Sequence, residues 1–223
     1  MSFQALGLSP ELLNAISDQG YTTPTPVQKQ AIPHILAGKD VLAGAQTGTG
    51  KTAGFTLPLL HRLMENHDPH QKPRRIRALV LVPTRELAAQ VLESIKTYGA
   101  HLPLIAEMIV GGASINMQIR QLRHGCDIIV ATTGRLCDHM NERNINLSSV
   151  EMLVLDEADR MLDMGFLPDI RRVIGNLPKQ RQNLLFSATY SAPIKALANQ
   201  ILQNPILVEV AKPNVTSDNI SEL

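Results

Sequence analysis

The segment "AGAQTGTGKTAGF", Ala43–Phe55, places two glycines, a lysine and a threonine directly after a short apolar run. Gly48 and Gly50 allow the backbone to curl so that its N–H groups face phosphate oxygens, while Lys51 suits the outer phosphates and the Thr52 hydroxyl suits Mg2+. A chance glycine-rich turn is disfavoured because the segment lies between an expected strand and an expected helix. Alanine takes the place of the first glycine of the usual pattern. The predicted phosphate-binding loop comprises Ala45, Gln46, Thr47, Gly48, Thr49, Gly50, Lys51 and Thr52.

On either side of this segment, short apolar runs alternate with helix-like patterns. The predicted strands cover residues 41–45, 77–82, 104–110, 127–131, 151–156, 183–187 and 206–210. Helices are expected over 84–99 and 191–202, the second with Ser191 as its N-cap and Pro193 in its first turn. Nearly continuous apolar strands separated by helices are typical of a covered parallel sheet. The pattern predicts an α/β fold with a mostly parallel central sheet and helices on both faces.

Composition sets limits on the class of protein. The 223 residues are 44% hydrophobic, which suits one large domain or two small ones. A net charge of +1 gives no strong overall attraction to nucleic acid, so any such contact must be local. Cys126 and Cys137 have neither metal-ligand nor disulfide spacing and indicate reduced intracellular thiols. With no signal-peptide pattern and no membrane-spanning run, we expect a cytoplasmic protein without membrane contact.

The stretch "LVLDEAD" supplies a second candidate site. Asp156 and Glu157 follow an apolar run at the carboxyl end of a predicted strand, where ligands of open parallel sheets gather. Asp156 suits Mg2+, through water, and Glu157 is placed to orient or deprotonate an attacking water. The alternative is an acidic helix start, because Asp and Glu favour first turns. Beside a phosphate-binding loop, the pattern favours catalytic carboxylates.

Taken together, "AQTGTGKT" and "LDEADRMLDMGF" resemble the DEAD-box family of ATP-dependent RNA helicases. Further matches are "GYTTPTPVQ" (20–28), "PTRELA" (83–88), "GG" (111–112), "TTGR" (132–135) and "SAT" (187–189). The bacterial RhlE-type subgroup is most similar. The resemblance covers essentially the whole chain, but only the first of the family's two RecA-like domains.

This resemblance implies a domain organisation. Residues 1–210 would form a RecA-like ATP-binding domain, with the family's adenine-reading Q motif in the region 1–28. Residues 211–223 would be a linker toward a second RecA-like domain, whose arginine fingers have no counterpart in this sequence. The polar and basic segment 66–77 is either a solvated loop or an RNA-facing patch.

The resemblance also identifies the nucleotide. Gln28 matches the family's adenine-reading residue, and a glutamine amide offers the donor and acceptor that adenine N7 and N6 require. Tyr21 matches the aromatic residue that stacks on the base, and Phe3 is expected to support that ring from behind. Without the family, "TPTPVQ" is simply a proline-rich helix start. The sequence has no [NT]-K-x-D element, which a guanine-specific site would need. The cofactors that the resemblance implies are therefore ATP, rather than GTP, together with Mg2+.

Further roles follow from the resemblance alone. Lys51, Asp156 and Glu157 are the implied catalytic residues, with Thr52 and Asp156 at the metal. Ser187 and Thr189 form the family's coupling motif, expected to hydrogen-bond toward Asp159. The residues implied to contact the RNA sugar-phosphate backbone are Pro83, Thr84, Arg85, Gly111, Gly112, Thr132 and Arg135.

One departure from the family is Thr133, where the family commonly has proline; its loss is expected to leave that helix start less rigid. Three hypotheses remain for a chain expected to be monomeric. The first is the ATP-binding core of an RNA-dependent ATPase that locally unwinds or remodels short RNA duplexes and RNA–protein complexes. The second is a DNA-directed translocase of the same superfamily. The third is an ATP-gated RNA clamp without strand separation.

Overall fold

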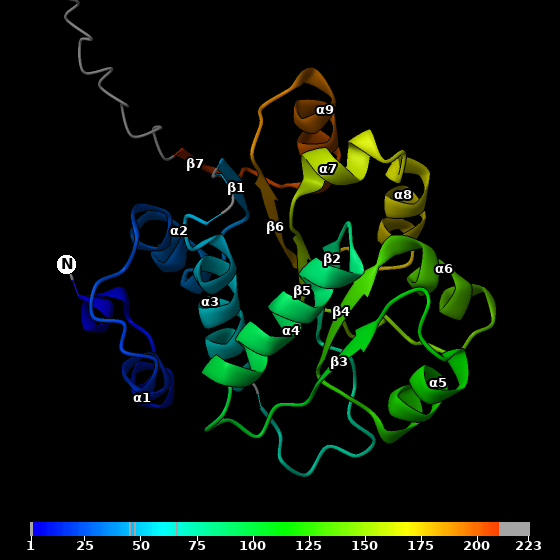
Figure 1. Ribbon diagram of the computed structural model, residues 1–223, viewed down its shortest axis with the longest axis horizontal. Coiled ribbons are helices and arrows are strands. Elements are labelled where there is room, and N and C mark those ends of the chain that lie inside the picture. The colour runs from blue at the N-terminus through cyan, green and yellow to red at the C-terminus, as the bar shows by residue number, and fades with distance from the viewer. Residues whose placement is uncertain (1, 45, 47, 66, 210–223) are drawn as a thin grey trace, which may run out of the picture.

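A computed structural model describes residues 2–44, 46, 48–65 and 67–209 (Figure 1). Its strands are β1 (Val41–Gly44), β2 (Ala78–Val82), β3 (Ala106–Ile109), β4 (Ile128–Thr132), β5 (Met152–Leu155), β6 (Gln182–Ser187) and β7 (Ile206–Glu209). The helices are the 3-10 helix η1 (Phe3–Leu6) and the α-helices α1 (Pro10–Asp18), α2 (Pro26–Leu36), α3 (Lys51–Glu65), α4 (Arg85–Tyr98), α5 (Ile115–His124), α6 (Thr133–Asn141), α7 (Ala158–Asp163), α8 (Leu167–Gly175) and α9 (Ala192–Ile201).

The strands form one sheet in the order β3-β4-β2-β5-β6-β1-β7, and all of its neighbouring strands pair in parallel. Each predicted strand is present, although the run 104–110 is a strand only over Ala106–Ile109. The predicted helices 84–99 and 191–202 are α4 and α9, and the Ser191 hydroxyl accepts a hydrogen bond from Ile194 N–H as the N-cap of α9. The predicted α/β fold with a parallel sheet is therefore confirmed.

Helices cover both faces of the sheet because successive strand residues point to opposite sides. Ala78, Val80 and Val82 of β2 belong to one buried cluster, which also contains the apolar residues of η1 and α1–α4. Leu79 and Leu81 belong to the other cluster, with residues of α6–α9. Both faces are apolar, which explains why the strands read as continuous hydrophobic runs rather than as an alternation.

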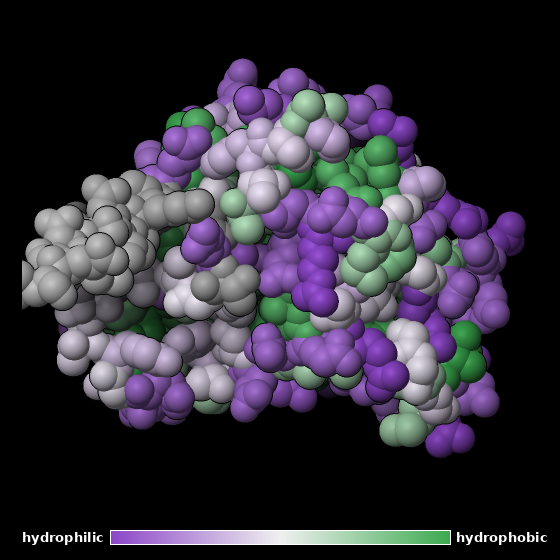
Figure 2. Space-filling view, turned by 45° about the horizontal axis from the view of Figure 1, so that its top comes forward, coloured by the Kyte–Doolittle hydropathy of each residue, from purple (hydrophilic) through white to green (hydrophobic). Residues whose placement is uncertain are grey.

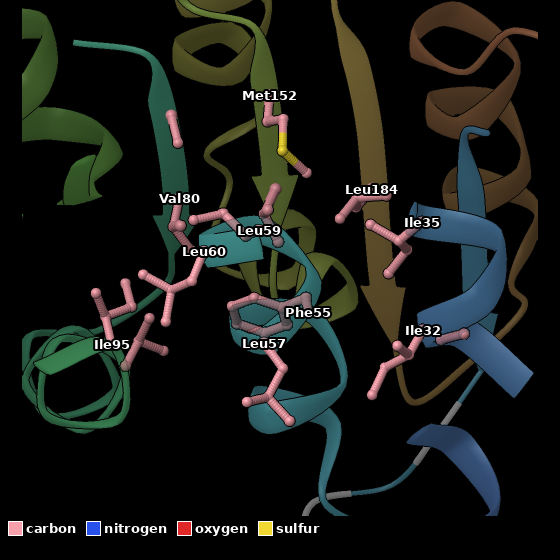
Figure 3. Close-up of a cluster of buried hydrophobic side chains, with 14 of the residues drawn as sticks. Ile32, Ile35, Phe55, Leu57, Leu59, Leu60, Val80, Ile95, Met152 and Leu184 are labelled. Carbon is pink, nitrogen blue, oxygen red and sulfur yellow. The ribbon is translucent and has the colours of Figure 1, made fainter. Parts of the chain in front are cut away.

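Helix α3 carries the centre of the first cluster. Its Phe55 packs against Phe186 of β6, with ring centroids 5.2 Å apart and a tilted geometry that suits the ring quadrupoles. Figure 3 shows Phe55, Leu57, Leu59 and Leu60 of α3 between the α2 side chains and Ile95 of α4. Lys51 begins this helix, so the packing of α3 fixes where the predicted phosphate-binding loop lies against the sheet.

In a parallel sheet the carboxyl ends of all strands lie at one edge. The predicted phosphate-binding loop follows β1, and the segments "PTRE", "TTGR", "DEAD" and "SAT" follow or end β2, β4, β5 and β6. Figure 2, which turns the upper part of Figure 1 forward, shows hydrophilic side chains gathered in the middle of the molecule. Topology alone thus brings five distant sequence motifs to one edge.

The described part of the segment 66–77, residues 67–77, is a loop that precedes β2 at the opposite edge, at the bottom of Figure 1. Residues 211–223, the predicted linker, lie outside the described residues. Among the residues that the structure describes, no helix is long and apolar enough to cross a membrane.

Candidate active site

The glycines of the predicted phosphate-binding loop adopt the backbone that the sequence requires. Gly48 has φ of 82° and Gly50 has φ of 83°, in the left-handed region that L side chains rarely adopt. A Cβ built on Gly48 meets no atom within 4 Å, whereas one on Gly50 would lie 2.6 Å from Gln28 Nε2. The Thr49 hydroxyl donates to the Gln46 carbonyl at 2.7 Å. Gly50 is therefore required both for its φ and for the close approach of Gln28.

Two residues of the predicted loop, Ala45 and Thr47, lie outside the described residues. The remaining loop residues lie between β1 and the start of α3, where Lys51 and Thr52 form its first turn. The strand–loop–helix context that the prediction required is present.

Gln28 joins the predicted Q motif to this loop. Its Oε1 accepts from Thr25 N–H at 2.9 Å as part of a capping box at the start of α2, and its Nε2 donates to the Gly50 carbonyl at 3.0 Å. These contacts use one of two amide N–H groups and one of two carbonyl lone pairs. Among the described residues, one donor and one acceptor position are therefore left for a ligand. The proline-rich helix start is also present, as the alternative interpretation of "TPTPVQ" expects, whereas adenine reading by Gln28 stays a prediction.

A cleft of about 500 Å³ lies beside Gln28. Tyr21 lines it with 57% of its surface exposed, and Phe3, which is buried in the first cluster, lines it as well. Support of Tyr21 by Phe3 stays a prediction. Helix α4 also lines the cleft, with residues that sequence reasoning did not identify as part of a site. These α4 residues are Gln90, Glu93, Ser94, Thr97 and Tyr98.

Two buried charges face each other at the carboxyl ends of β1 and β5. Lys51 Nζ lies 3.9 Å from Asp156 Oδ1, and both side chains are almost fully buried. Burial raises the pKa of Asp156 to about 6, although the Lys51 charge opposes the shift. Lys51 Nζ has no hydrogen-bond partner among the described residues. An orphaned buried ammonium next to a desolvated carboxylate fits a site for a phosphate with a metal ion.

Glu157 has a strained backbone. Its φ of 52° and ψ of 50° are left-handed, which is uncommon for a residue with a side chain and typical of functional sites. It occupies the N-cap position of α7 but makes no side-chain capping bond, and its Oε2 lies 3.3 Å from Arg160 Nη1. The pair Asp156–Glu157 does precede a helix, as the acidic-helix-start alternative requires, yet neither carboxylate caps that helix through an N–H of its first turn.

The contact to Asp159 differs from the expectation. Asp159 Oδ2 accepts a hydrogen bond at 3.2 Å from the backbone N–H of Ala188, not from the Ser187 or Thr189 hydroxyls. The Ser187 hydroxyl donates to the Thr189 carbonyl and accepts from the Thr189 N–H, so it closes its own turn. Ser187 is fully buried at the end of β6.

Among the residues implied to contact RNA, those that follow β2 and β3 lie close together. A Cβ on Gly112, which has φ of 69°, would collide with the Arg85 guanidinium. Thr84 caps α4, its hydroxyl accepting from Leu87 N–H at 3.2 Å. Gly111 faces open space beside Gly112, and Pro83 is buried between β2 and α4.

Gln118 on α5 is a residue that sequence reasoning missed. Its Nε2 donates to the Val110 carbonyl at 2.8 Å, while its Oε1 accepts from Arg135 Nη1 at 3.3 Å and is 3.0 Å from His139 Nε2. Arg135 also donates to the Ala113 carbonyl at 2.9 Å. Arg135 is thus tied to both ends of the Gly111–Gly112 turn, to Val110 through the buried Gln118 amide and to Ala113 directly. A glutamine on the inner face of an amphipathic helix was the available signal.

Thr132 and Thr133 form the start of α6. Thr132 is the N-cap, without a side-chain capping bond, and has φ of −86° and ψ of 142°. Thr133 is fully buried at the first helical position, and its hydroxyl has no hydrogen-bond partner among the described residues. Its backbone N–H is one of the first N–H groups of the helix, which have no carbonyl partner within the helix, so a proline here would remove no intrahelical hydrogen bond.

We expect Thr133→Pro to stabilise the domain by about 1–2 kcal/mol, because it removes an unsatisfied buried hydroxyl and restricts the unfolded chain. Thr132 already has the extended backbone that a following proline demands. Urea denaturation with an unchanged slope would measure the gain. Thr133→Val is the matched control, since it removes the hydroxyl alone and is expected to yield only part of the effect. Destabilisation by both substitutions would contradict the interpretation.

Comparison with known proteins places these features in a family. The family model for the DEAD/DEAH box helicase matches residues 25–197. The DEAD-box ATP-dependent RNA helicase RhpA of Helicobacter pylori is 44% identical over 221 residues, which are 99% of this chain and 44% of that protein. CshA of Bacillus cereus, described in the same words, is also 44% identical over 99% of this chain and 41% of its own length.

A solved structure agrees with these matches. The crystal structure of a DEAD box protein from the hyperthermophile Methanococcus jannaschii superposes with a TM-score of 0.86 at 38% identity, covering 94% of this chain and 56% of that one. The present chain spans less than half the length of the two curated relatives. Similarity to the RhlE-type subgroup stays a prediction. With a parallel sheet that gathers its motifs at one edge, and with a family match over most of its length, the chain belongs to the DEAD/DEAH box helicase family.

Proposed function

We propose that residues 1–210 are the first RecA-like domain of a cytoplasmic RNA-dependent ATPase, which locally unwinds or remodels short RNA duplexes and RNA–protein complexes. Residues 211–223 would lead to a second RecA-like domain. The observation that carries this proposal is the buried pair of Lys51 and Asp156, 3.9 Å apart, beside a cleft that Gln28 shares with the glycine loop. The relatives RhpA and CshA, which are named ATP-dependent RNA helicases, support it.

ATP and Mg2+ are the proposed cofactors, and each group around the cleft has a separate role. The remaining donor and acceptor of Gln28 select adenine, and Tyr21 covers the base. Lys51 binds the outer phosphates, while Thr52 and Asp156 hold Mg2+, which when bound neutralises charge on the phosphates. Glu157 orients the attacking water and accepts its proton. The left-handed backbone at Glu157 supports this role because it holds the carboxylate at the exit of β5.

The RNA would contact the same edge of the sheet through its sugar-phosphate backbone. Arg85, Arg135 and the Gly111–Gly112 turn offer guanidinium and backbone N–H donors, which position a strand without reading its sequence. The hydrogen bond from Ala188 N–H to Asp159 links the segment after β6 to the helix that follows Glu157. This contact supports a coupling role for Asp159, Ser187 and Thr189, carried by the backbone of the motif.

Replacing Gln28 tests adenine selectivity. We expect Gln28→Ala to reduce the preference for ATP over GTP by about 1–3 kcal/mol, the value of a good bidentate base contact. Because Gln28 also supports Gly50 and Thr25, affinity for both nucleotides is expected to fall, and the ratio of the two dissociation constants is the informative quantity. Gln28→Glu is the matched variant, since it keeps the acceptor but lacks the amide donor. Equal binding of ATP and GTP by the unmutated chain would contradict the assignment.

A pH titration tests the role of Asp156. Its raised pKa of about 6 means that protons compete with Mg2+ for the carboxylate at mildly acid pH. Mg2+-dependent nucleotide affinity is therefore expected to be constant above pH 7 and to fall as pH drops below about 6. Isothermal titration of the native chain and of Asp156→Asn, compared at each pH, removes the titration of the nucleotide itself. The informative quantity is the nucleotide affinity of the native chain divided by that of Asp156→Asn. If this ratio were the same at pH 5 and pH 7.5, the carboxylate would be excluded as a metal ligand.

The activity of residues 1–223 alone tests the domain assignment. An arginine finger contributes about 10³–10⁵ in rate, and the proposal places these arginines in the second domain. We expect the isolated chain to bind adenine nucleotides with Mg2+ but to show almost no RNA-stimulated ATPase or unwinding. Joined to a second RecA-like domain, it is expected to recover both.

Three outcomes of that experiment would overturn the proposal. Robust RNA-stimulated turnover by residues 1–223 would place the catalytic arginine within this chain. Stimulation of the joined protein by DNA as strongly as by RNA would instead support the DNA-directed translocase. ATP-dependent RNA retention without strand separation would support the clamp.

A further inference from the structure

A second cleft, of about 540 Å³, lies at the edge of the sheet opposite the candidate active site. Three segments line it: 73–76 before β2, 122–126 before β4, and 144–149 before β5. We call it the amino-edge cleft, because these segments precede the strands. Its principal polar side chains are Arg74, Arg75, Arg123, Asn144, Asn146 and Ser148. The first segment is the end of the basic stretch whose role the sequence left open.

The walls of the amino-edge cleft are held in place by internal contacts. Arg74 Nη1 donates to Asp127 Oδ2 at 2.6 Å and to the Pro103 carbonyl at 2.9 Å. Gly125 has φ of 82°, and a Cβ there would lie only 3.1 Å from the Arg74 carbonyl, so two of the segments are in close backbone contact. Asn146 Oδ1 accepts from Ser148 N–H at 2.9 Å. A loop that was merely solvated would not need this close fit.

The charge in the cleft is positive and partly uncompensated. Three arginines line it and no carboxylate does. Arg74 shares its charge with Asp127, but Arg75 and Arg123 are exposed and form no ion pair or side-chain hydrogen bond with any other residue described. Burial raises the pKa of the Cys126 thiol, which also lines the cleft, to about 12, so this side chain adds no negative charge. In a chain whose net charge is only +1, this is a local concentration of free cationic groups.

We propose that the amino-edge cleft binds the phosphodiester backbone of RNA, at a site separate from the ATP-dependent contacts at the carboxyl edge. Guanidinium groups match phosphate geometry, and the Asn146 amide and Ser148 hydroxyl supply further donors for phosphate and sugar oxygens, whereas Asn144 Nδ2 already donates to Glu142 at 2.8 Å. No aromatic side chain lines the cleft, so bases are not stacked and binding is independent of sequence.

The two sites differ in what controls them. The amino-edge cleft lies at the opposite edge of the sheet from Gln28, Lys51 and Asp156. It therefore binds RNA without requiring a nucleotide at the carboxyl edge. RNA held there would stay attached while the carboxyl edge releases its strand. The choice of RNA among polyanions rests on the proposed function, whereas the location and the phosphate chemistry do not.

The test uses the double variant Arg75→Glu/Arg123→Glu. Binding of a short single-stranded RNA to residues 1–223 without nucleotide is measured by fluorescence anisotropy between about 50 and 200 mM salt. We expect the affinity to fall at least about tenfold and the slope of log K against log salt to become shallower by about 1–2, as for two lost phosphate contacts. Affinity for ADP with Mg2+ is expected to be unchanged.

The matched control is Arg171→Glu/Lys195→Glu, which makes the same change in net charge at exposed positions of α8 and α9. An equal loss of RNA affinity in the control would reduce the effect to overall charge and overturn the proposal. So would native RNA affinity in the cleft variant, or no binding by the native chain at the lowest salt. Displacement of the RNA by millimolar inorganic phosphate would identify a small-anion site instead. The Gln28 and ATPase experiments are unaffected by these results, so the two proposals fail separately.

Discussion

An ammonium and a carboxylate that are both withdrawn from water define the centre of this domain. Lys51 and Asp156 lie 3.9 Å apart, and Lys51 Nζ forms no hydrogen bond with any described residue. Burying two charges costs several kcal/mol each, and their mutual attraction offsets this only in part. The apolar clusters on both faces of the sheet must therefore supply the stability that holds them there. In the proposed function, binding a phosphate and a cation would relieve a cost already present in the fold.

The parallel sheet explains why so many groups meet near that pair. Lys51 begins α3 directly after the loop that follows β1, and Asp156 directly follows β5, two strands away across β6. Asp156 is attached directly to a buried strand, and Lys51 belongs to the first turn of α3, whose apolar residues are packed in the core, so neither can move without disturbing the core. Gln28 comes from a different helix and is held by Gly50 and Thr25 instead. The hydrogen bond from Gln28 to Gly50 therefore joins the loop directly to α2.

Sequence reasoning succeeded where the signal was local. Continuous apolar runs predicted each strand, and the hydroxyl of Ser191 together with Pro193 predicted the start of α9, because both depend on neighbours within a few residues. It failed where contacts join residues far apart in the chain. Gln118 reaches Arg135 and His139, 17 and 21 residues away, and no local pattern encodes that network. The amino-edge cleft likewise needs three separate segments, so composition could suggest only a basic loop.

The bond between Asp159 and Ala188 is made by a peptide group, and that affects how the position responds to substitution. Ala188 is exposed, so most side chains fit there, and every residue except proline brings the same N–H. Substitutions of Ala188 would thus leave the hydrogen bond to Asp159 in place. Substitutions of Ser187 would disturb it, because the buried Ser187 hydroxyl sets the shape of the turn. The residues on which this contact depends are therefore Asp159 and Ser187, rather than Ala188, whose backbone N–H forms the bond.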